Sequence, residues 1–132
     1  MSELKELAAE AKHELLTHII PFWRGMRDDK FGGYYGYLSY DLALDEKAEK
    51  GCILNSRITW FFANAYLLYK DGGISEEECE AAGFKGEDLL AEAKHGYEFL
   101  REHCIDKEYG GIFWSLNYDG TPLDTTLSLI HI

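Results

Sequence analysis

Apolar residues near the start of the chain recur at three- and four-residue intervals, with charged residues between them: Leu4, Leu7, Ala8, Ala11, Leu15 and Ile19. This period predicts an amphipathic helix over residues 3–20, with one buried face and one solvated face. We expect the helix to end at Pro21, because proline cannot donate the backbone hydrogen bond that a helix interior requires.

The pattern changes in the next segment. Residues 28–45 contain a Gly-Gly pair and four tyrosines, which predicts a turn followed by short strands, that is, a hairpin. Residues 52–70 are apolar on nearly every side and predict a buried inner helix. A Gly-rich, acidic loop over residues 71–86 precedes a third, outer helix over about residues 87–103. The apolar stripe of this helix is Leu89, Ala93, Tyr97 and Leu100.

Part of this pattern returns later in the chain. The pair Gly110 and Gly111 stands 78 residues (110 minus 32) after the first Gly-Gly pair, and a Tyr-Asp pair follows each at the same interval. A long internal period is typical of repeat architectures, in which several units stack or close into a ring to bury their apolar faces. The same interval added to Arg57 passes the end of the 132-residue chain, so we expect the sequence to be truncated.

Composition narrows the class of protein. The chain has 132 residues, 46% of them hydrophobic, which predicts one packed domain. A formal net charge of -11 argues against nucleic acid and anionic membrane surfaces as partners. The longest apolar run, residues 58–69, is interrupted by Asn64 and is shorter than the roughly 18 to 20 residues that cross a bilayer. We therefore expect no membrane partner.

Three cysteines, Cys52, Cys79 and Cys104, form no CxxC motif, and no signal-peptide pattern opens the chain. These features predict a reduced, cytoplasmic protein. Cys52 begins the inner helix and is interpreted as a small buried residue and not as a nucleophile. No HExxH or Cys/His ligand spacing occurs, so we predict neither a metal nor another cofactor.

Arg57 is the clearest candidate functional residue, because a guanidinium in so apolar a helix must be paired or must face water. On a helix, Arg57, Phe61 and Asn64 share one face, and Trp60 lies beside them. One interpretation is a structural arginine that pairs with an acidic loop such as residues 28–29 or caps backbone carbonyls. The other is a binding residue. The residues alone favour the structural interpretation, because most buried arginines are ion-paired.

Four segments together resemble the N-terminal third of sugar epimerases in the N-acyl-D-glucosamine 2-epimerase superfamily: THIIPFW, RDDKFGGYYGYL, KGCILNSRITWFFANAYLL and AKHGYEFLREHCIDKEYGGIFWSLNYDGTPLDTT. The resemblance covers about residues 12–126. It implies an (α/α)6 barrel of inner and outer helices with short β-hairpins between helix pairs. The expected fold class is therefore mainly α, with residues 1–126 forming the N-terminal portion of one such barrel domain.

The resemblance also implies an activity. It indicates a carbohydrate epimerase that inverts C2 of the reducing-end sugar of cellobiose or a related disaccharide through an enediolate, so the expected partner is a small carbohydrate. It places Arg57, with Trp60 and Asn64, in the substrate pocket. The catalytic acid/base histidines are expected in later repeats, so the chain alone is expected to be inactive. Oligomeric state is left open.

The histidines of this chain receive no catalytic role. His13, His18, His95 and His103 are predicted to lie on the surface or to interact with helix C-terminal dipoles. His131 lies in the final segment, residues 127–132, which reads LSLIHI where the family continues into a polar helix. We interpret this segment as a translated adapter and not as native sequence.

Two alternative functions remain. The chain is also compatible with an (α/α)6 glycoside hydrolase, in which two carboxylates act as acid and base, or with a non-catalytic helical module that binds carbohydrate or a protein partner. Turn chemistry is the simpler interpretation of the candidate carboxylates Asp28, Asp29, Asp106, Glu108, Asp119 and Asp124. Core packing is predicted for most of the hairpin aromatics Tyr34, Tyr35, Tyr37, Phe113 and Trp114, although such rings can also stack on sugars.

Overall fold

The computed structural model describes residues 2–123. Its helices are α1 (Ser2–Glu14), the π-helical segment η1 (Leu15–Ile19), α2 (Ile20–Gly25), α3 (Cys52–Lys70), α4 (Glu76–Ala81), α5 (Gly86–Phe99) and the π-helical segment η2 (Leu100–Cys104). Two short strands, β1 (Lys50–Gly51) and β2 (Ser115–Leu116), pair antiparallel. The predicted mainly α class is confirmed.

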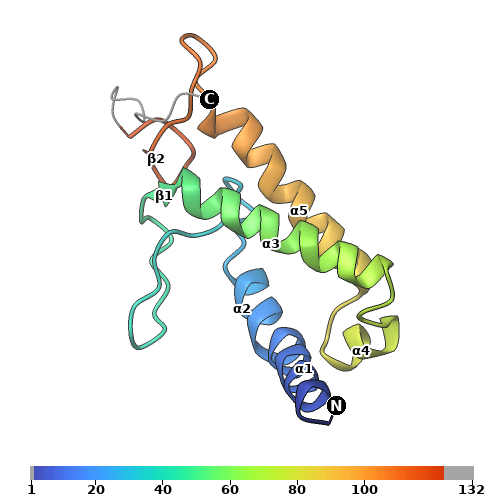
Figure 1. The fold of residues 1–132 in the computed structure, drawn as a ribbon. Coiled ribbons are helices and arrows are strands. Elements are labelled where there is room, and N and C mark those ends of the chain that lie inside the picture. Colours follow the sequence, from blue (N-terminus) through green and yellow to red (C-terminus); the bar gives the residue numbers. More distant parts are fainter. Residues whose placement is uncertain (1, 124–132) are drawn as a thin grey trace.

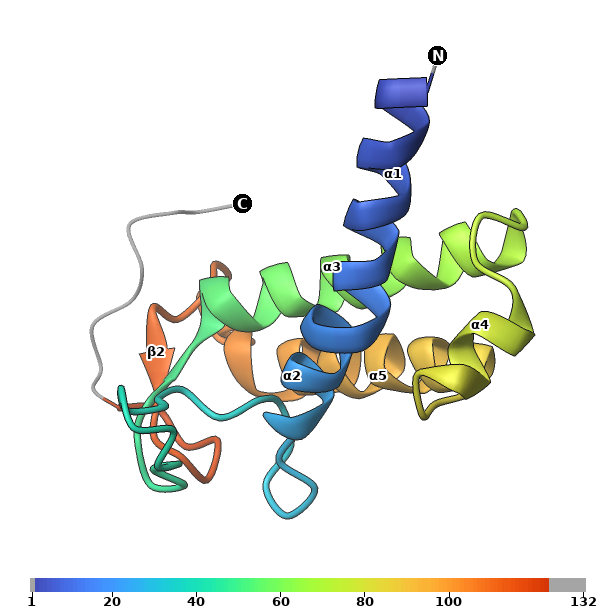
Figure 2. The same ribbon diagram turned by 90° about the horizontal axis from the view of Figure 1, so that it is seen from below.

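Helices α3 and α5 lie side by side and run in opposite directions (Figures 1 and 2). Ile58 and Phe62 of α3 and Leu89 of α5 are buried in the main hydrophobic core. At Gly96 the two helices approach so closely that an added Cβ would clash with the Thr59 hydroxyl. The helices predicted over residues 52–70 and 87–103 are therefore confirmed, and they form one packed pair.

The first helical segment is longer than the sequence predicts. Helices α1 and α2 and the intervening η1 form one continuous rod (Figure 1). Pro21 lies in the first turn of α2, where its missing N–H is tolerated, so the predicted end at this residue is wrong. Helix α1 extends away from the α3–α5 pair and has no buried residue (Figure 2). The predicted buried face is therefore absent over α1, where Leu4 and Leu7 are each 62% exposed.

Glu92 of α5 anchors the rod. Its side chain is only 3% exposed, and its two carboxylate oxygens accept hydrogen bonds from Arg24 Nε at 3.0 Å and Arg27 Nη1 at 3.2 Å. The Tyr34 hydroxyl also donates to Glu92 Oε1, at 3.0 Å. The buried negative charge is therefore compensated, and α5 is held to the segment of residues 24–34, which is far from it in the sequence.

The loop predicted over residues 71–86 contains a short helix, α4. The Ser75 hydroxyl accepts a hydrogen bond from the Glu78 N–H at 3.1 Å, and the Glu78 carboxylate accepts one from the Ser75 N–H at 3.0 Å. This reciprocal capping box is a recognisable signal for a helix start. Six residues are too few to show a hydrophobic period, which is why the periodic pattern missed α4.

The two Gly-Gly turns have the same backbone structure. The Asp28 N–H donates to the Gly33 carbonyl at 3.0 Å, and the Asp106 N–H donates to the Gly111 carbonyl at 3.0 Å. Asp28 Oδ1 accepts two backbone N–H groups, at 2.9 and 3.1 Å, and Asp106 Oδ1 accepts two, at 2.9 and 3.3 Å. The predicted internal repeat is thereby confirmed for the two Gly-Gly turns.

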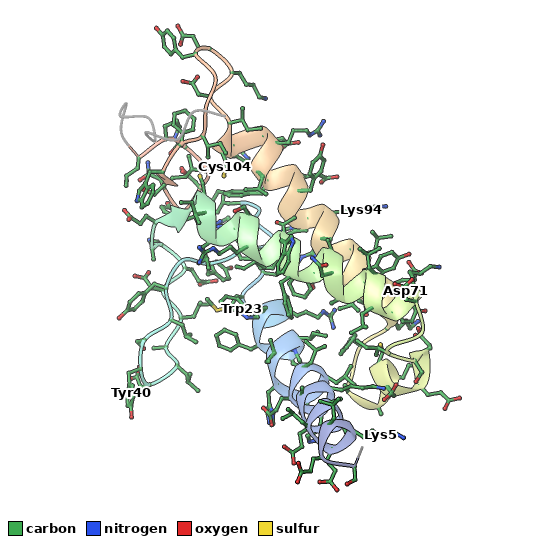
Figure 3. All side chains as sticks on the ribbon, in the orientation of Figure 1. Lys5, Trp23, Tyr40, Asp71, Lys94 and Cys104 are labelled. Carbon is green, nitrogen blue, oxygen red and sulfur yellow. The ribbon has the colours of Figure 1, made fainter. Side chains whose placement is uncertain are left out.

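The first hairpin is less regular than predicted. Between residues 28 and 49 the turn is followed by an extended loop, and backbone pairing there is limited to the isolated bridges Arg27 with Tyr34 and Leu38 with Leu44. Tyr40 lies fully exposed on this loop, far from the helices (Figure 3). Glycines at 32, 33 and 36 interrupt the alternation that a longer strand needs.

Candidate functional site

One face of α3 is not covered by the described part of the chain. Its exposed residues recur at three- and four-residue steps and are here called the open face: Ile53, Ser56, Arg57, Trp60, Asn64, Leu67 and Leu68. The prediction that this helix is buried almost all round is therefore wrong, because α5 and the rod cover only part of its surface. The open face combines large apolar side chains with one cation and one amide.

Arg57 is exposed and makes no ion pair with any residue in the range 2–123. The acidic residues proposed as its structural partners are engaged elsewhere. Asp28 pairs with Lys50, and Asp29 pairs with Arg27, each at 2.6 Å. Pairing of Arg57 with this loop is therefore excluded, and its guanidinium remains accessible from solvent.

The structure brings Trp60 and Asn64 together with Arg57, as predicted. The Trp60 ring is 69% exposed, and Asn64 Nδ2 donates to the Trp60 carbonyl at 2.9 Å, so the amide lies along the helix surface. Phe61 differs from the prediction because it packs against the main core, edge-to-face with Phe62 at 5.2 Å between ring centroids. The predicted face is thus composed of Arg57, Trp60 and Asn64 without Phe61.

Lys50 and Asn55 hold the start of α3, and sequence reasoning assigned neither a role. Lys50 Nζ donates to Asp28 Oδ2 at 2.6 Å and to the Gly32 carbonyl at 2.7 Å. Burial tends to raise the pKa of Asp28, but hydrogen bonds from Lys50 and two backbone N–H groups hold that pKa below its ordinary value. This clamp fixes the first Gly-Gly turn against the residue two positions before α3.

Asn55 completes the clamp from within the helix. Its Oδ1 accepts a hydrogen bond from the Tyr34 N–H, and its Nδ2 donates to the Gly51 carbonyl, both at 2.9 Å. Gly33 has a positive φ of 68°, and a Cβ there would lie 2.8 Å from Asn55 Oδ1, so the turn requires glycine at this position. Together these contacts fix the orientation of the helical turn that carries Arg57.

Three of the carboxylates proposed for a hydrolase stabilise turns. Asp28 and Asp106 stabilise the Gly-Gly turns, and Asp119 Oδ1 accepts hydrogen bonds from the Thr121 N–H at 3.1 Å and hydroxyl at 2.7 Å. Turn chemistry is confirmed for these three residues. Asp124, His131 and the whole segment 127–132 lie outside the described residues.

His95 departs from the surface role predicted for the histidines. Its ring is partly buried, and Nε2 lies 2.8 Å from the Gly33 carbonyl, so it links α5 to the first Gly-Gly turn. His13 and His18 are exposed as predicted, and His18 Nδ1 lies 3.0 Å from Glu14. His103 is partly buried beside Phe99.

The hairpin aromatics divide into two groups. Tyr34, Tyr35 and Phe113 pack against the hydrophobic clusters, as predicted. Tyr37 and Trp114 are 55% and 62% exposed and lie outside the core, so the prediction of core packing for most of these aromatics is confirmed. Cys52 is buried, as predicted, and all three cysteines are free thiols.

Two further properties of residues 2–123 bear on the type of site. No helix in this range combines the length and hydropathy needed to cross a membrane. No group of three or more histidine, cysteine, aspartate or glutamate side chains in this range is arranged to hold a metal ion.

Comparison with known proteins relates this arrangement to one group of enzymes. The chain is 49% identical over 119 residues to cellobiose 2-epimerase from Ruminococcus albus, covering 90% of the chain and 27% of the relative. It is 50% identical over 113 residues to cellobiose 2-epimerase from Eubacterium cellulosolvens, covering 86% of the chain and 24% of the relative. No family model matches the chain.

Solved structures give the same result. The crystal structure of a sugar epimerase from a ruminal bacterium matches with a TM-score of 0.75 at 49% identity, over 90% of this chain and 27% of that one. The structure of cellobiose 2-epimerase from Bacillus thermoamylovorans B4167 matches with a TM-score of 0.77 at 38% identity, over 91% of this chain and 27% of that one. This chain spans about a quarter of the length of the relatives that it matches. Over nine-tenths of its length the chain is therefore homologous to part of the cellobiose 2-epimerases, which confirms both the resemblance and the fold class, a portion of an (α/α)6 barrel, that the sequence implied.

Proposed function

We propose that this chain forms one part of a sugar 2-epimerase that acts on cellobiose or a related disaccharide, and that the open face of α3 lines its substrate pocket. The observation that carries the proposal is the 49% identity to a cellobiose 2-epimerase over 90% of the chain. The accessible guanidinium of Arg57 supplies the local chemistry. A reduced, cytoplasmic location is part of the proposal, supported by the three free thiols.

The proposed reaction needs a cation where negative charge develops. In the open-chain sugar the C1 aldehyde acidifies the C2 proton, and removal of that proton leaves an enediolate. A fixed guanidinium stabilises this charge better than water does, because its orientation is set before the reaction. Arg57 is suited to this role, since the Lys50 and Asn55 contacts orient its helix.

The neighbouring residues are suited to binding the sugar. The exposed Trp60 ring offers an apolar face on which a pyranose can stack, and the Asn64 amide can hydrogen-bond to hydroxyl groups. Epimerisation only moves protons, so it requires no redox cofactor. The acid and base are expected, from the resemblance, to be histidines in the part of the enzyme that this chain does not span.

A chimera tests the proposal. The aligned residues of this chain replace the matching 119-residue segment of the Ruminococcus albus enzyme. We expect the chimera to form the C2 epimer of cellobiose and to incorporate deuterium at C2 in D2O, and the isolated chain to do neither. A folded chimera without turnover would contradict the proposal, and release of free glucose would favour a hydrolase.

The role of Arg57 is tested in the same chimera. Arg57→Ala is expected to lower kcat/KM by about 100-fold or more, the usual effect of removing a group that stabilises transition-state charge. Arg101→Ala is the matched control, because Arg101 is an exposed arginine on η2, outside the open face. Equal activity of the two variants would remove Arg57 from the site.

A further inference from the structure

Cys52, at the start of α3, and Cys104, at the end of η2, belong to one buried cluster. Figure 3 shows Cys104 beside the start of α3. Each is 1% exposed, and both belong to the second buried cluster, with Phe99 and Leu116. They are 52 residues apart in the sequence (104 minus 52), so no spacing motif connects them. Only the fold brings the two thiols together.

Backbone hydrogen bonds fix both cysteines against the same short segment. The Cys52 N–H donates to the Trp114 carbonyl at 3.1 Å, and the Phe113 N–H donates to the Cys104 carbonyl at 2.8 Å. Because residues 113 and 114 are adjacent, the backbones of both cysteines are hydrogen-bonded to neighbouring residues of the same segment. Both side chains therefore lie in one small buried cluster.

The two thiols differ in acidity. Interaction with the neighbouring Cys104 thiol lowers the pKa of Cys52, although burial opposes this effect. Interaction with the Cys52 thiol, together with burial, raises the pKa of Cys104. Cys52 is also the first residue of α3, where the helix N-terminus favours a thiolate. Cys52 is thus the better nucleophile. Cys104 stays protonated, so it can supply a proton when it reacts with an oxidised Cys52.

A small molecule can reach the pair through a groove. The groove has a volume of about 300 Å³ and is lined by both cysteines together with apolar residues that include Ile53, Leu100 and Ile112. An apolar wall favours a small uncharged oxidant such as hydrogen peroxide over a charged one such as glutathione disulfide.

We propose that Cys52 and Cys104 form a redox-active dithiol that hydrogen peroxide converts into an intramolecular disulfide. The Cys52 thiolate attacks one peroxide oxygen, which gives a sulfenic acid on Cys52 and releases hydroxide. The Cys104 sulfur then attacks the Cys52 sulfur, the S–S bond forms, and the sulfenic oxygen leaves as water with the Cys104 proton. Overall, two thiols and one peroxide give one disulfide and two waters. This proposal is independent of the proposed function.

The disulfide joins the start of α3 to the end of η2 and restricts the unfolded chain. We expect peroxide-treated protein to melt roughly 5 to 15 °C higher than reduced protein, and dithiothreitol to reverse the shift. The cross-link lies at the end of α3 that precedes Arg57, so it ties the helix of the open face to the second Gly-Gly turn.

Tryptic mapping of the 132-residue chain tests the proposal. After peroxide treatment, the protein is alkylated in denaturant and digested without reduction. Trypsin cleaves after Lys50, Arg57, Arg101 and Lys107, so the expected product links peptide 51–57 to peptide 102–107. Its mass is lower by two hydrogen atoms than the sum of the two peptides. Oxidised or unmodified peptides without this link, or a link to peptide 71–85, would overturn the proposal.

Variants separate the two roles and supply a control. Cys79→Ser should leave the linked peptide unchanged, because Cys79 lies in the other core cluster, where burial and three nearby glutamates raise its pKa. In Cys104→Ser a sulfenic-acid trap such as dimedone should label peptide 51–57, whereas in Cys52→Ser labelling of peptide 102–107 should be several-fold weaker. The reverse order would overturn the assignment of Cys52 as nucleophile. If either variant fails to fold, the mapping of the unmodified chain still decides whether the disulfide forms.

Discussion

Lys50 Nζ lies 2.6 Å from Asp28 Oδ2, and the two side chains are 0% and 2% exposed. The second Gly-Gly turn has an aspartate at the equivalent position, Asp106, and its Oδ1 also accepts two backbone N–H groups. Within residues 2–123, however, no cation pairs with Asp106. The chain therefore contains the same turn twice, once with a buried counter-ion and once without it.

This difference predicts unequal effects of one substitution. Asp28→Asn should lower the free energy of unfolding by about 3 to 5 kcal/mol, because it leaves the Lys50 ammonium buried without a counter-charge. Asp106→Asn should cost under about 1 kcal/mol, because asparagine retains the oxygen that accepts the backbone N–H groups. Urea unfolding followed by far-UV circular dichroism measures both values.

The two variants serve as each other's control. Both change a buried aspartate in a Gly-Gly turn to its amide, so any general effect on the turn is shared. Equal losses would mean that Lys50 is not the source of the cost. Lys50→Met in the Asp28→Asn background should recover part of the stability, since it removes the uncompensated charge.

Acid should destabilise the protein through the same pair. The pKa of Asp28 is lower in the folded state than its ordinary value of 3.8, so the unfolded chain binds the proton first as the pH falls. The stabilising contribution is therefore complete above the unfolded pKa and is lost as the pH falls through the folded pKa. The free energy of unfolding should decrease between about pH 5 and pH 2. In Asp28→Asn the slope should be smaller, and an unchanged slope would contradict this assignment.

The sequence predicted the long elements because their signals are periodic. The boundaries of the inner helix over residues 52–70 agree with α3, and the interval of 78 residues identified two turns that proved to share their hydrogen bonds. The predicted helix end at Pro21 was wrong because the sequence does not distinguish a proline that stops a helix from one tolerated in a first helical turn. The π-helical η1 before it has no signal in the hydrophobic period.

The candidate site was only partly predictable. Arg57, Trp60 and Asn64 follow from helical spacing, so their common face could be predicted. Lys50 could not be identified, because a lysine in a charged loop gives no sign that Asp28, 22 positions earlier, will bury it. The contact between Cys52 and Cys104 likewise depends on how the α3–α5 pair and the small sheet pack together.

Close packing between α3 and α5 depends on a glycine. Gly96→Ala should lower the free energy of unfolding by about 1 to 3 kcal/mol, because the added methyl would overlap the Thr59 side chain and force the helices apart. Gly25→Ala is the matched control, since Gly25 is also helical and no atom lies within 4 Å of its Cβ position. It should be neutral or stabilise by up to about 1 kcal/mol.

Thermal and urea unfolding of both alanine variants measure this difference. Thr59→Ala combined with Gly96→Ala should recover part of the loss, because it removes the hydroxyl that the added methyl would overlap. A Gly96→Ala variant as stable as Gly25→Ala would show that the helices do not approach as closely as the structure places them.

Glu92 should be the main link between the α1–α2 rod and α5. Glu92→Ala removes the buried carboxylate that accepts from Arg24, Arg27 and the Tyr34 hydroxyl. The two arginines then keep only the more exposed carboxylates of Asp88 and Asp29. We expect a loss of about 3 kcal/mol in the free energy of unfolding, together with faster tryptic cleavage after Arg24 and Arg27. Glu98→Ala, an exposed position on the same helix, should change both quantities little. If the rod were held chiefly by apolar contacts of Leu16 and Ile20, Glu92→Ala and Glu98→Ala would show the same cleavage rate, because neither changes that packing.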